Sequence, residues 1–399
     1  MRIGIDLQVL GQRPWTGVGK YAYHLAEALK KLDTPHEFVF FEPSEKHIPF
    51  FTNHWARARE MKKAKLDVLH GVANAFPLRI TNQYEYTNTK LVLTVHDLAI
   101  YKHPEWFARG QWFATKFLVP RSIKKADAII APSQTTKKDL MELFGVPPEK
   151  INVIPLGVES WFFSRSVIPA EAGIQDSRNW IPDLVGDDKK RKKYILFVGT
   201  LEPRKNVGRL IEAYLELPKN LRDEYDLVIA GASGWGDEIQ NAKIKSQNYN
   251  SKFKSKIRIL EYVENSKLPM IYQNASLFVY PSLYEGFGLP VLEAMAAGVP
   301  VVTSKESAMA EILTPSQSPP YQGGEKVGDN TRYEIPNTIL MVDPYSVDEI
   351  RDAMTRVLTD QNLAHEMRER EVEIAREFTW EKTARETLRV YEKLVTDNG

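Results

Sequence analysis

Apolar residues fall in short runs along the first half of the chain, and several of these runs are separated by longer segments with helical spacing. Short apolar runs bounded by turn residues are typical of buried strands. The predicted strands of this half are Arg2–Leu7, Glu37–Phe41, Val68–His70, Leu91–His96 and Ala128–Ala131. Strands that alternate with helices favour a parallel sheet covered by helices on both faces.

The same alternation starts again near residue 194. Here the predicted strands are Tyr194–Gly199, Leu227–Ala230, Ile257–Leu260, Leu277–Tyr280, Val299–Thr303 and Ile339–Val342. A chain of 399 residues is longer than one hydrophobic core usually organises. We therefore predict an α/β protein with two doubly wound domains, residues 1–163 and 194–375.

Two segments lack apolar periodicity. Residues 164–193 gather Pro, Gly, Asp and a basic run, which predicts an interdomain linker. Residues 314–337 interrupt the second domain where a short turn would suffice. We interpret both as exposed passengers, because lengthening a surface loop costs little entropy; a substrate lid is the alternative, since long loops are often functional.

The end of the chain, residues 376–399, contains a predicted helix from about Trp380 to Thr396 with one apolar stripe. Periodicity does not say which domain this stripe packs against. We expect the helix to cross back to the N-terminal domain.

Composition excludes several classes of function. Lys and Arg number 53 and Asp and Glu number 52, so no overall field would draw the chain onto nucleic acid. The chain has no cysteine, which excludes disulfides and thiolate chemistry and fits a reducing cytoplasm. Residues 1–10 do not resemble a signal peptide, and there is no apolar run of about 18 residues. We expect a cytoplasmic protein.

The most specific stretch of sequence begins where a predicted strand ends, near Tyr280. A loop with two glycines follows, Pro290 suits the first turn of a helix, and Gly298 suits its C-terminal cap. Glu285 then precedes the helix and Glu293 lies one turn inside it. Because helical side chains lean toward the N-terminus, we expect both carboxylates to face one pocket.

The helix that carries Glu293 is otherwise apolar, so this carboxylate is expected to be buried and to need hydrogen-bond donors. Sugar or ribose hydroxyls would supply them. Helix capping or a structural ion pair is the alternative.

A second constellation is the basic pair Arg204 and Lys205, between a predicted strand and a helix that begins near Val207. Cations at the positive end of a helix dipole are unfavourable unless an anion lies between them. Helix N-termini bind phosphate, so we interpret the pair as a diphosphate clamp; a solvated basic turn is the alternative. The clamp requires the turn at 204–205 to lie beside the loop after Glu285.

These motifs resemble glycosyltransferase family 4, a large group of retaining enzymes of the GT-B type. The two glutamates, eight positions apart with Gly-Phe-Gly-Leu-Pro between them, are similar to its signature. Its other blocks resemble GTLEPRKN at 199–206, TVHDLAIYKHP at 94–104, APSQTTKKDL at 131–140 and VIPLGVE at 153–159. The local likeness is to mannosyltransferase-like members that build bacterial cell-surface polysaccharide.

The resemblance implies two Rossmann-like domains facing a central cleft, with the acceptor on the N-terminal domain and a nucleotide sugar on the C-terminal domain. It implies that Glu285 contacts the donor sugar, that Glu293 binds the ribose, and that Arg204 and Lys205 hold the diphosphate. The amides of Gly286, Phe287, Gly288 and Leu289 would line the sugar and phosphate pocket, and the backbone of Val263 would contact the base. Thr200, also expected at the donor, stands where many relatives carry Arg.

On the acceptor side, His96 is expected at the carboxyl end of its strand, where doubly wound sheets bind ligands. From the residues alone, His96 bonded to backbone and Asp97 capping a turn explain the pair equally well. The resemblance implies that His96 lies between donor sugar and acceptor. It also places Gly17 and Gly19, a short glycine-rich turn before a helix at Tyr21–Leu32, near donor phosphate and acceptor.

We expect front-face transfer with retention, in which the departing diphosphate, stabilised by Arg204, Lys205 and helix amides, accepts or steers the acceptor proton. No Asp-x-Asp follows an apolar strand, so we expect neither a metal ion nor another cofactor; the donor would be GDP-mannose or a UDP-sugar. The acceptor would be a glycan or a lipid-linked sugar. Basic and aromatic residues between Arg57 and Lys65 and between Trp106 and Lys125 could touch the inner face of a membrane, or they are core aromatics with solvated cations.

Three other functions are alternatives. A phosphorylase or epimerase of the same architecture is the nearest, and a non-catalytic or decayed carbohydrate-binding protein is another. A dehydrogenase ranks low, because no Gly-x-Gly-x-x-Gly follows a predicted strand.

Overall fold

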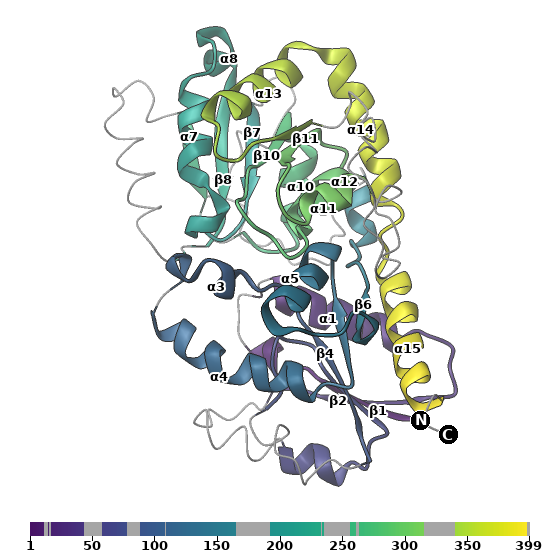
Figure 1. Cartoon of the computed structure of the whole chain (residues 1–399). Helices are drawn as coiled ribbons and strands as arrows, with labels where there is room; N and C mark the ends of the chain where they lie inside the picture. Colours follow the sequence, from purple (N-terminus) through teal and green to yellow (C-terminus); the bar gives the residue numbers. More distant parts are fainter. Residues whose placement is uncertain are drawn as a thin grey trace, which may run out of the picture. The chain divides into compact units, whose positions relative to one another are not determined.

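The computed structural model describes residues 1–11, 15, 17–43, 58–77, 88–107, 109–164, 192–232, 234, 256–260, 263–314 and 340–396, without the side chains of 109–114. The chain divides into two units, shown in Figure 1. Unit 1 is Met1–Gly157 with Phe378–Gly399, and unit 2 is Val158–Glu377. The segments interpreted as linker and insert, 164–193 and 314–337, lie outside the described residues except at their ends.

Unit 1 contains a six-stranded parallel sheet in the order β2-β1-β3-β4-β5-β6. Its strands are β1 (Arg2–Asp6), β2 (Glu37–Phe41), β3 (Val68–Gly71), β4 (Lys90–Thr94), β5 (Ala128–Ala131) and β6 (Ile151–Val153). Its α-helices are α1 (Gly17–Lys30), α3 (Ala99–Lys102), α4 (Arg109–Lys125), α5 (Gln134–Phe144) and α15 (Trp380–Thr396), and its 3₁₀ turns are Gln8–Gly11, Pro104–Trp106 and Pro148–Lys150.

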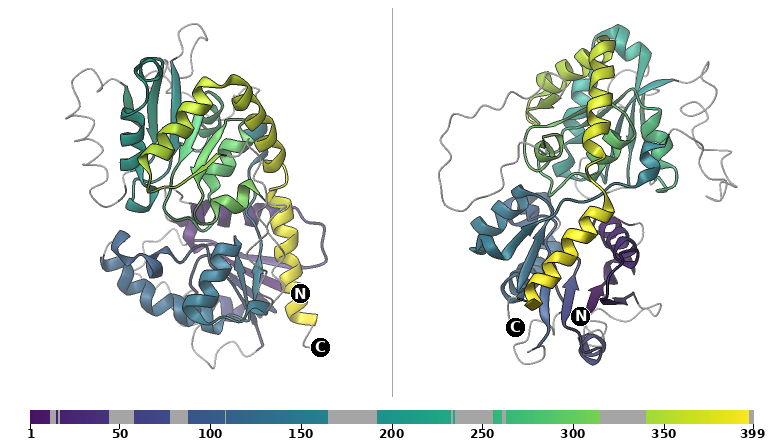
Figure 2. Two further views of the ribbon diagram at one scale, coloured as in Figure 1. Left: turned by 45° about the horizontal axis from the view of Figure 1, so that its top comes forward. Right: turned by 90° about the vertical axis from the view of Figure 1, so that its right-hand side faces the viewer.

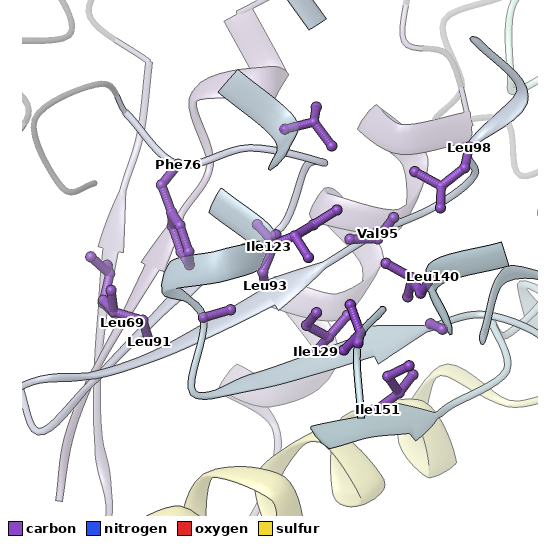
Figure 3. Close-up of a cluster of buried hydrophobic side chains, with 14 of the residues drawn as sticks. Leu69, Phe76, Leu91, Leu93, Val95, Leu98, Ile123, Ile129, Leu140 and Ile151 are labelled. Carbon is purple, nitrogen blue, oxygen red and sulfur yellow. The ribbon is translucent and has the colours of Figure 1, made fainter. Parts of the chain in front are cut away.

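The two faces of this sheet differ in polarity. Alternate strand residues such as Leu69, Leu93 and Ile129 point into an apolar cluster with Ile123 of α4 and Leu140 of α5, shown in Figure 3. The opposite face is covered by α1 and α15, which contact each other. Figures 1 and 2 show α15 returning to this unit at the end of the chain.

Unit 2 contains a second six-stranded parallel sheet, in the order β12-β11-β10-β7-β8-β9. Its strands are β7 (Lys193–Val198), β8 (Tyr225–Ala230), β9 (Ile257–Leu260), β10 (Leu277–Tyr280), β11 (Val301–Ser304) and β12 (Leu340–Val342). Its α-helices are α7 (Val207–Leu215), α8 (Lys219–Glu224), α10 (Leu268–Gln273), α11 (Leu289–Ala296), α12 (Met309–Leu313), α13 (Val347–Thr359) and α14 (Gln361–Ala375), and its 3₁₀ turns are Ser160–Phe163 and Pro203–Lys205.

The strand order of unit 2 reverses between β7 and β10. Chain connections run outward from β7 through β8 to β9 on one side, and from β10 through β11 to β12 on the other. Helix α13 packs on α7, helix α11 packs on α14, and both α13 and α11 contact β10 and β11, so helices cover both faces (Figure 1). In such sheets the loops diverge at the reversal and leave a crevice at the carboxyl ends of the strands.

The predicted α/β architecture is confirmed, and the structure corrects three details. Strand β4 ends at Thr94, so His96 lies in the loop after the strand rather than at its last position. Helix α1 begins at Gly17, so Gly17 and Gly19 lie in the first helical turn rather than in a turn before the helix. Strand β6 was not predicted, because its three residues carry too little apolar pattern.

No helix among the described residues combines the length and the apolar character that crossing a bilayer requires.

Unit 2 contains one buried carboxyl group that bears on stability. Glu371 of α14 is fully buried, and one carboxyl oxygen, Oε1, accepts a hydrogen bond from the Val301 amide over 3.2 Å. The other oxygen, Oε2, has no hydrogen-bond partner within the described part of the chain. Burial raises the pKa of Glu371 well above its usual 4.5, against the opposing effects of the Val301 amide and Arg368.

An acid whose folded pKa is raised contributes its full stability below the unfolded pKa and loses it as the pH rises. As the pH rises above about 4.5 toward the raised pKa of Glu371, we therefore expect the unfolding free energy of the wild type to fall by up to about 1.4 kcal/mol per pH unit. The Glu371→Gln variant should therefore be more stable than the wild type at about pH 8, and the difference in stability between the two proteins should be smallest near pH 5. Melting temperatures across this range test the prediction, with exposed Glu373→Gln on the same helix as control; parallel curves for E371Q and wild type would contradict it.

Candidate active site

The basic turn and the glutamate loop lie side by side at the reversal of the sheet in unit 2. The turn Pro203–Lys205 follows β7, and the loop from Pro281 to Gly288 follows β10, the neighbouring strand. The Arg204 carbonyl accepts hydrogen bonds from the Leu283 amide over 2.7 Å and from the Ser282 hydroxyl over 2.9 Å. The proximity that the diphosphate clamp requires is therefore present.

Glu285 is the centre of the contacts between these turns. Its Oε2 accepts a hydrogen bond from Arg204 Nη1 over 3.0 Å, and its Oε1 accepts one from Lys205 Nζ. The Tyr280 hydroxyl also donates to Oε1 over 3.0 Å, and the Ser282 hydroxyl lies 2.8 Å from Oε1, so that its one hydrogen is shared between Glu285 and the Arg204 carbonyl. Only 7% of Glu285 is exposed, so these partners replace the water that its charge would otherwise need.

A second carboxylate belongs to the same cluster. Glu202 is buried and accepts a hydrogen bond from Arg204 Nε over 2.7 Å, and its Oε1 lies 3.9 Å from Lys205 Nζ. The two cations are therefore matched by two carboxylates of the protein itself. We call Glu202, Arg204, Lys205 and Glu285 the charge cluster. The conflict that two cations create near a helix N-terminus is resolved here by the protein's own anions.

The charge cluster keeps Glu285 ionised. Burial alone would raise its pKa, but the charges of Lys205 and Arg204 and the hydrogen bonds from Lys205 and Ser282 outweigh burial and hold the pKa at about 2. Burial and the neighbouring Arg204 lower the pKa of Lys205, which the two carboxylates oppose. The stability that Glu285 contributes is present above its usual pKa of 4.5 and is lost as the pH falls toward 2.

Two residues with left-handed backbone fix the cluster in place. Asn206 has φ 60° and caps α7, and its amide group donates to the carbonyls of Pro281 and Pro344 over 2.9 and 2.6 Å. Ser307 has φ 66°, and its hydroxyl bonds both to the amide, over 2.8 Å, and to the carbonyl of Glu285. Non-glycine residues in this conformation are held there by their surroundings and often mark functional sites.

Glu293 has a separate partner. It lies on α11 and is 1% exposed, and its Oε2 accepts a hydrogen bond from the Tyr272 hydroxyl over 2.9 Å. The helix has the predicted ends, with Pro290 in its first turn and Gly298 at φ 68° after its last. The described contacts do not join Glu293 to Glu285, and the prediction that Glu293 binds ribose stays a prediction.

The remaining predicted donor residues lie near the same edge of unit 2. Gly286, Phe287 and Gly288 form the buried loop between β10 and α11, and Leu289 is the first residue of α11. Gly288 has φ 113°, a backbone conformation that requires glycine. Thr200 lies two residues after β7, and Val263 is buried in the segment after β9. Their roles toward a donor stay predictions.

The predicted acceptor residues belong to unit 1. His96 is buried and its Nε2 donates to the Val72 carbonyl over 2.8 Å, while its amide donates to Asn74 Oδ1 over 2.7 Å. Burial lowers its pKa, which the Val72 carbonyl and Asp97 oppose. Gly17 is exposed and Gly19 is buried, where a Cβ would press on Trp15. The structure therefore fixes the backbone contact of His96 and leaves its role toward an acceptor a prediction.

Several residues of the site were not predicted from the sequence. Glu202 lies inside the block GTLEPRKN, and Tyr280 ends the predicted strand before the glutamate loop, so their positions beside the two motifs were a signal for both. Tyr272 and Ser307 have no local signal, because each meets its glutamate only through the folded sheet.

Two family models match the two halves of the chain. The model described as "Glycosyltransferase Family 4" matches residues 15–161, and the model described as "Glycosyl transferases group 1" matches residues 185–374. The chain belongs to glycosyltransferase family 4. The predicted resemblance is thus confirmed. O-antigen chain mannosyltransferase B of Escherichia coli is 29% identical over 405 residues, which cover 96% of this chain and 97% of that relative.

Solved structures confirm the fold of this family 4 chain. Sucrose-phosphate synthase of Thermosynechococcus elongatus matches with a TM-score of 0.72 and 19% identity, over 99% of each chain. HepE of Anabaena, solved in complex with UDP and glucose, matches with a TM-score of 0.70 and 15% identity, over 98% of this chain and 100% of that one. The chain has the GT-B fold of two Rossmann-like domains. As a member of this glycosyltransferase family it is a hexosyltransferase.

The charge cluster predicts a specific pattern of stability. Lys205→Met leaves Glu285 buried with one cation fewer, so we expect it to cost about 3 kcal/mol of unfolding free energy. The double variant Lys205→Met/Glu285→Gln removes the unpaired charge and should recover more than half of this loss.

Urea unfolding of both variants measures the effect. Lys193→Met serves as control, because Lys193 forms an exposed pair with Glu224 and should cost less than about 1 kcal/mol. A double variant no more stable than K205M alone would contradict the prediction.

Proposed function

We propose that this glycosyltransferase moves mannose from a nucleoside diphosphate sugar to a glycan or lipid-linked acceptor. GDP-mannose is the first candidate donor, and a UDP-sugar is the second. The transfer retains the anomeric configuration, needs no metal ion or other cofactor, and contributes to cell-surface polysaccharide. The observation that carries the proposal is the charge cluster at the strand-order reversal of unit 2. The name of the Escherichia coli relative supports mannose and a surface polysaccharide.

The charge cluster suits an exchange of anions. Since its two cations are already matched by carboxylates, a diphosphate would bind by taking the place of Glu285 beside Arg204 and Lys205. The carboxylate of Glu285 would then be released to accept hydrogen bonds from hydroxyls of the donor sugar. Binding a complete donor thus converts an internal ion pair into contacts with both the diphosphate and the sugar.

In the reaction, the bond between the anomeric carbon and the diphosphate oxygen breaks while the acceptor oxygen attacks the same face of the sugar. The acceptor proton passes to the departing diphosphate oxygen, and the nucleoside diphosphate leaves. Arg204 and Lys205 would stabilise the charge that develops on this leaving group, and such fixed electrostatic groups contribute strongly to catalysis. No protein nucleophile is needed.

Unit 1 would supply the acceptor side. We assign His96 to the space between donor sugar and acceptor, with Gly17 and Gly19 at the nearby helix start. On α4, Phe117 is 44% exposed beside Arg121, and Lys124 and Lys125 follow in the last turn. We propose that this basic segment gives the protein peripheral contact with the anionic inner face of the membrane, where a lipid-linked acceptor would lie.

Lys205→Ala and Glu285→Ala test the donor site. Each removes a group of the charge cluster, and we expect each to lower kcat for transfer from GDP-mannose by about 10²–10³-fold. Lys193→Ala and Glu224→Ala, from the exposed pair in the same unit, are the matched controls and should leave the rate unchanged.

The assay follows release of nucleoside diphosphate together with a lengthened glycan, for GDP- and UDP-sugars in parallel. Calorimetric binding of the donors separates a non-catalytic protein, which binds without transfer, from an enzyme. Phosphate-dependent release of a sugar phosphate would instead favour a phosphorylase. No heat with any sugar nucleotide would overturn the proposal.

Metal removal is a separate test. Because the proposal assigns the stabilisation of the leaving group to Arg204 and Lys205, we expect the transfer rate of protein treated with EDTA to equal that of untreated protein. Loss of activity with EDTA and its recovery with Mg²⁺ or Mn²⁺ would contradict metal-independent transfer.

A further inference from the structure

A continuous chain of buried polar groups crosses the interior of unit 1. The Tyr391 hydroxyl of α15 shares a hydrogen bond of 2.6 Å with His70 Nδ1 on β3. His70 Nε2 shares one of 2.7 Å with Thr94 Oγ1 on β4, and Thr94 Oγ1 shares one of 2.9 Å with the Tyr21 hydroxyl of α1. All four side chains are at most 1% exposed. We call Tyr391, His70, Thr94 and Tyr21 the polar chain.

The polar chain lies on the face of the sheet that α1 and α15 cover. The opposite face holds the apolar cluster of Figure 3, so the polar groups are confined to one side. Burial lowers the pKa of His70 to about 3, with a further contribution from His96, and His70 is therefore neutral. A neutral imidazole donates from one nitrogen and accepts at the other, which matches one partner on each side.

Of the two described contacts of the His96 ring, one is made by a member of the polar chain and the other by a residue close to it in sequence. His96 Nε2 donates to the carbonyl of Val72, which follows His70 by two residues. The ring of Tyr21 meets the His96 ring edge to face, with centroids 4.8 Å apart. His96 itself follows Thr94 by two residues. The polar chain therefore meets the His96 ring directly through Tyr21, and indirectly through the segments that follow β3 and β4.

The bond to Val72 also decides which atom of His96 is available for chemistry. A carbonyl oxygen only accepts, so Nε2 carries the proton. In the neutral ring, Nδ1 then has a lone pair and accepts a hydrogen bond from a hydroxyl group. Sugars and glycan acceptors present hydroxyl groups, so this tautomer suits both.

Helix α15 is tied closely to this region. Gly157 packs against the backbone of Trp380 so tightly that a Cβ on Gly157 would clash with it. The Trp380 ring stacks on His24 with centroids 5.1 Å apart and lies 6.2 Å from the Tyr21 ring. Helix α15 therefore contacts α1 at Trp380 and the sheet at Tyr391, which meets His70 of β3.

We propose that Tyr391 is a positioning residue: through His70, Thr94 and Tyr21 it holds His96 in one orientation and in the tautomer with the proton on Nε2. The C-terminal helix is then part of the acceptor side of the enzyme. The kinetic part of this inference rests on the proposed function, and the tautomer of His96 does not.

The chain offers a matched control on the same helix. Thr387 lies one turn before Tyr391 and is fully buried, and its Oγ1 has no hydrogen-bond partner among the residues that the structure describes. Thr387→Val thus removes a buried hydroxyl outside the polar chain. Tyr391→Phe removes a buried hydroxyl that holds His70, and both changes preserve side-chain shape.

The experiment compares full-length wild type, Tyr391→Phe, Thr387→Val and Thr94→Val. We expect Y391F and T94V to lower kcat about tenfold, with unchanged affinity for the sugar nucleotide, because the donor contacts belong to unit 2. T387V should retain the wild-type kcat. A purely structural role would alter the melting temperature and leave kcat per folded molecule unchanged, and that result would overturn the inference.

Histidine side-chain ¹⁵N spectra test the same point without catalysis. The His96 signals, assigned with His96→Gln, should show the proton on Nε2 in wild type and T387V and a mixture of tautomers in Y391F. An identical His96 spectrum in Y391F would overturn the inference even in an active enzyme. A wild type that transfers no sugar would refute the proposed function, and the spectra would still decide the positioning of His96.

Discussion

The site of unit 2 depends on one constraint: the buried carboxylate of Glu285 must remain paired with Arg204 and Lys205. A charge removed from water costs several kcal/mol unless partners replace the water. The adjacency of β7 and β10, the left-handed turns at Asn206 and Ser307, and the hydroxyls of Tyr280 and Ser282 all serve this pairing. Because the partners come from two different loops, the pairing also fixes the loops to each other.

Much of the fold could be predicted because buried parallel strands are nearly continuous apolar runs. The ends of elements were harder. The apolar run that starts at Leu91 continues to Val95, one residue beyond the end of β4 at Thr94. Helix α1 begins at Gly17 although its first turn contains two glycines, which have low helix propensity. The basic turn and the glutamate loop could be predicted because local chemistry marks them. The bonds to Tyr272 and Ser307 could not, since only tertiary structure brings those hydroxyls to Glu293 and Glu285.

The charge cluster of unit 2 and the polar chain of unit 1 bury polar groups in different ways. In unit 2, the charge cluster lies at the carboxyl edge of the sheet, where a ligand can replace an internal partner. In unit 1, neutral hydroxyls and imidazoles lie within the sheet face itself, and each satisfies the next. A neutral network keeps its geometry without a bound ion, whereas a charged cluster changes its partners when another anion enters. The neutral polar chain therefore suits positioning, and the charge cluster suits binding and release of a ligand.

This difference bears on how tightly a donor would bind. If the cations were unpaired, a diphosphate would gain the full attraction of two positive charges, about 4 kcal/mol for each unit pair at 4 Å near a protein surface. Glu285 already provides much of that attraction to the two cations. The exchange therefore gains only the amount by which the cations attract a diphosphate more strongly than they attract the carboxylate. The hydrogen bonds from sugar hydroxyls to the released Glu285 then add to the binding free energy of the donor. A nucleoside diphosphate without a sugar would leave that carboxylate unpaired, which favours the complete donor over the product and promotes product release.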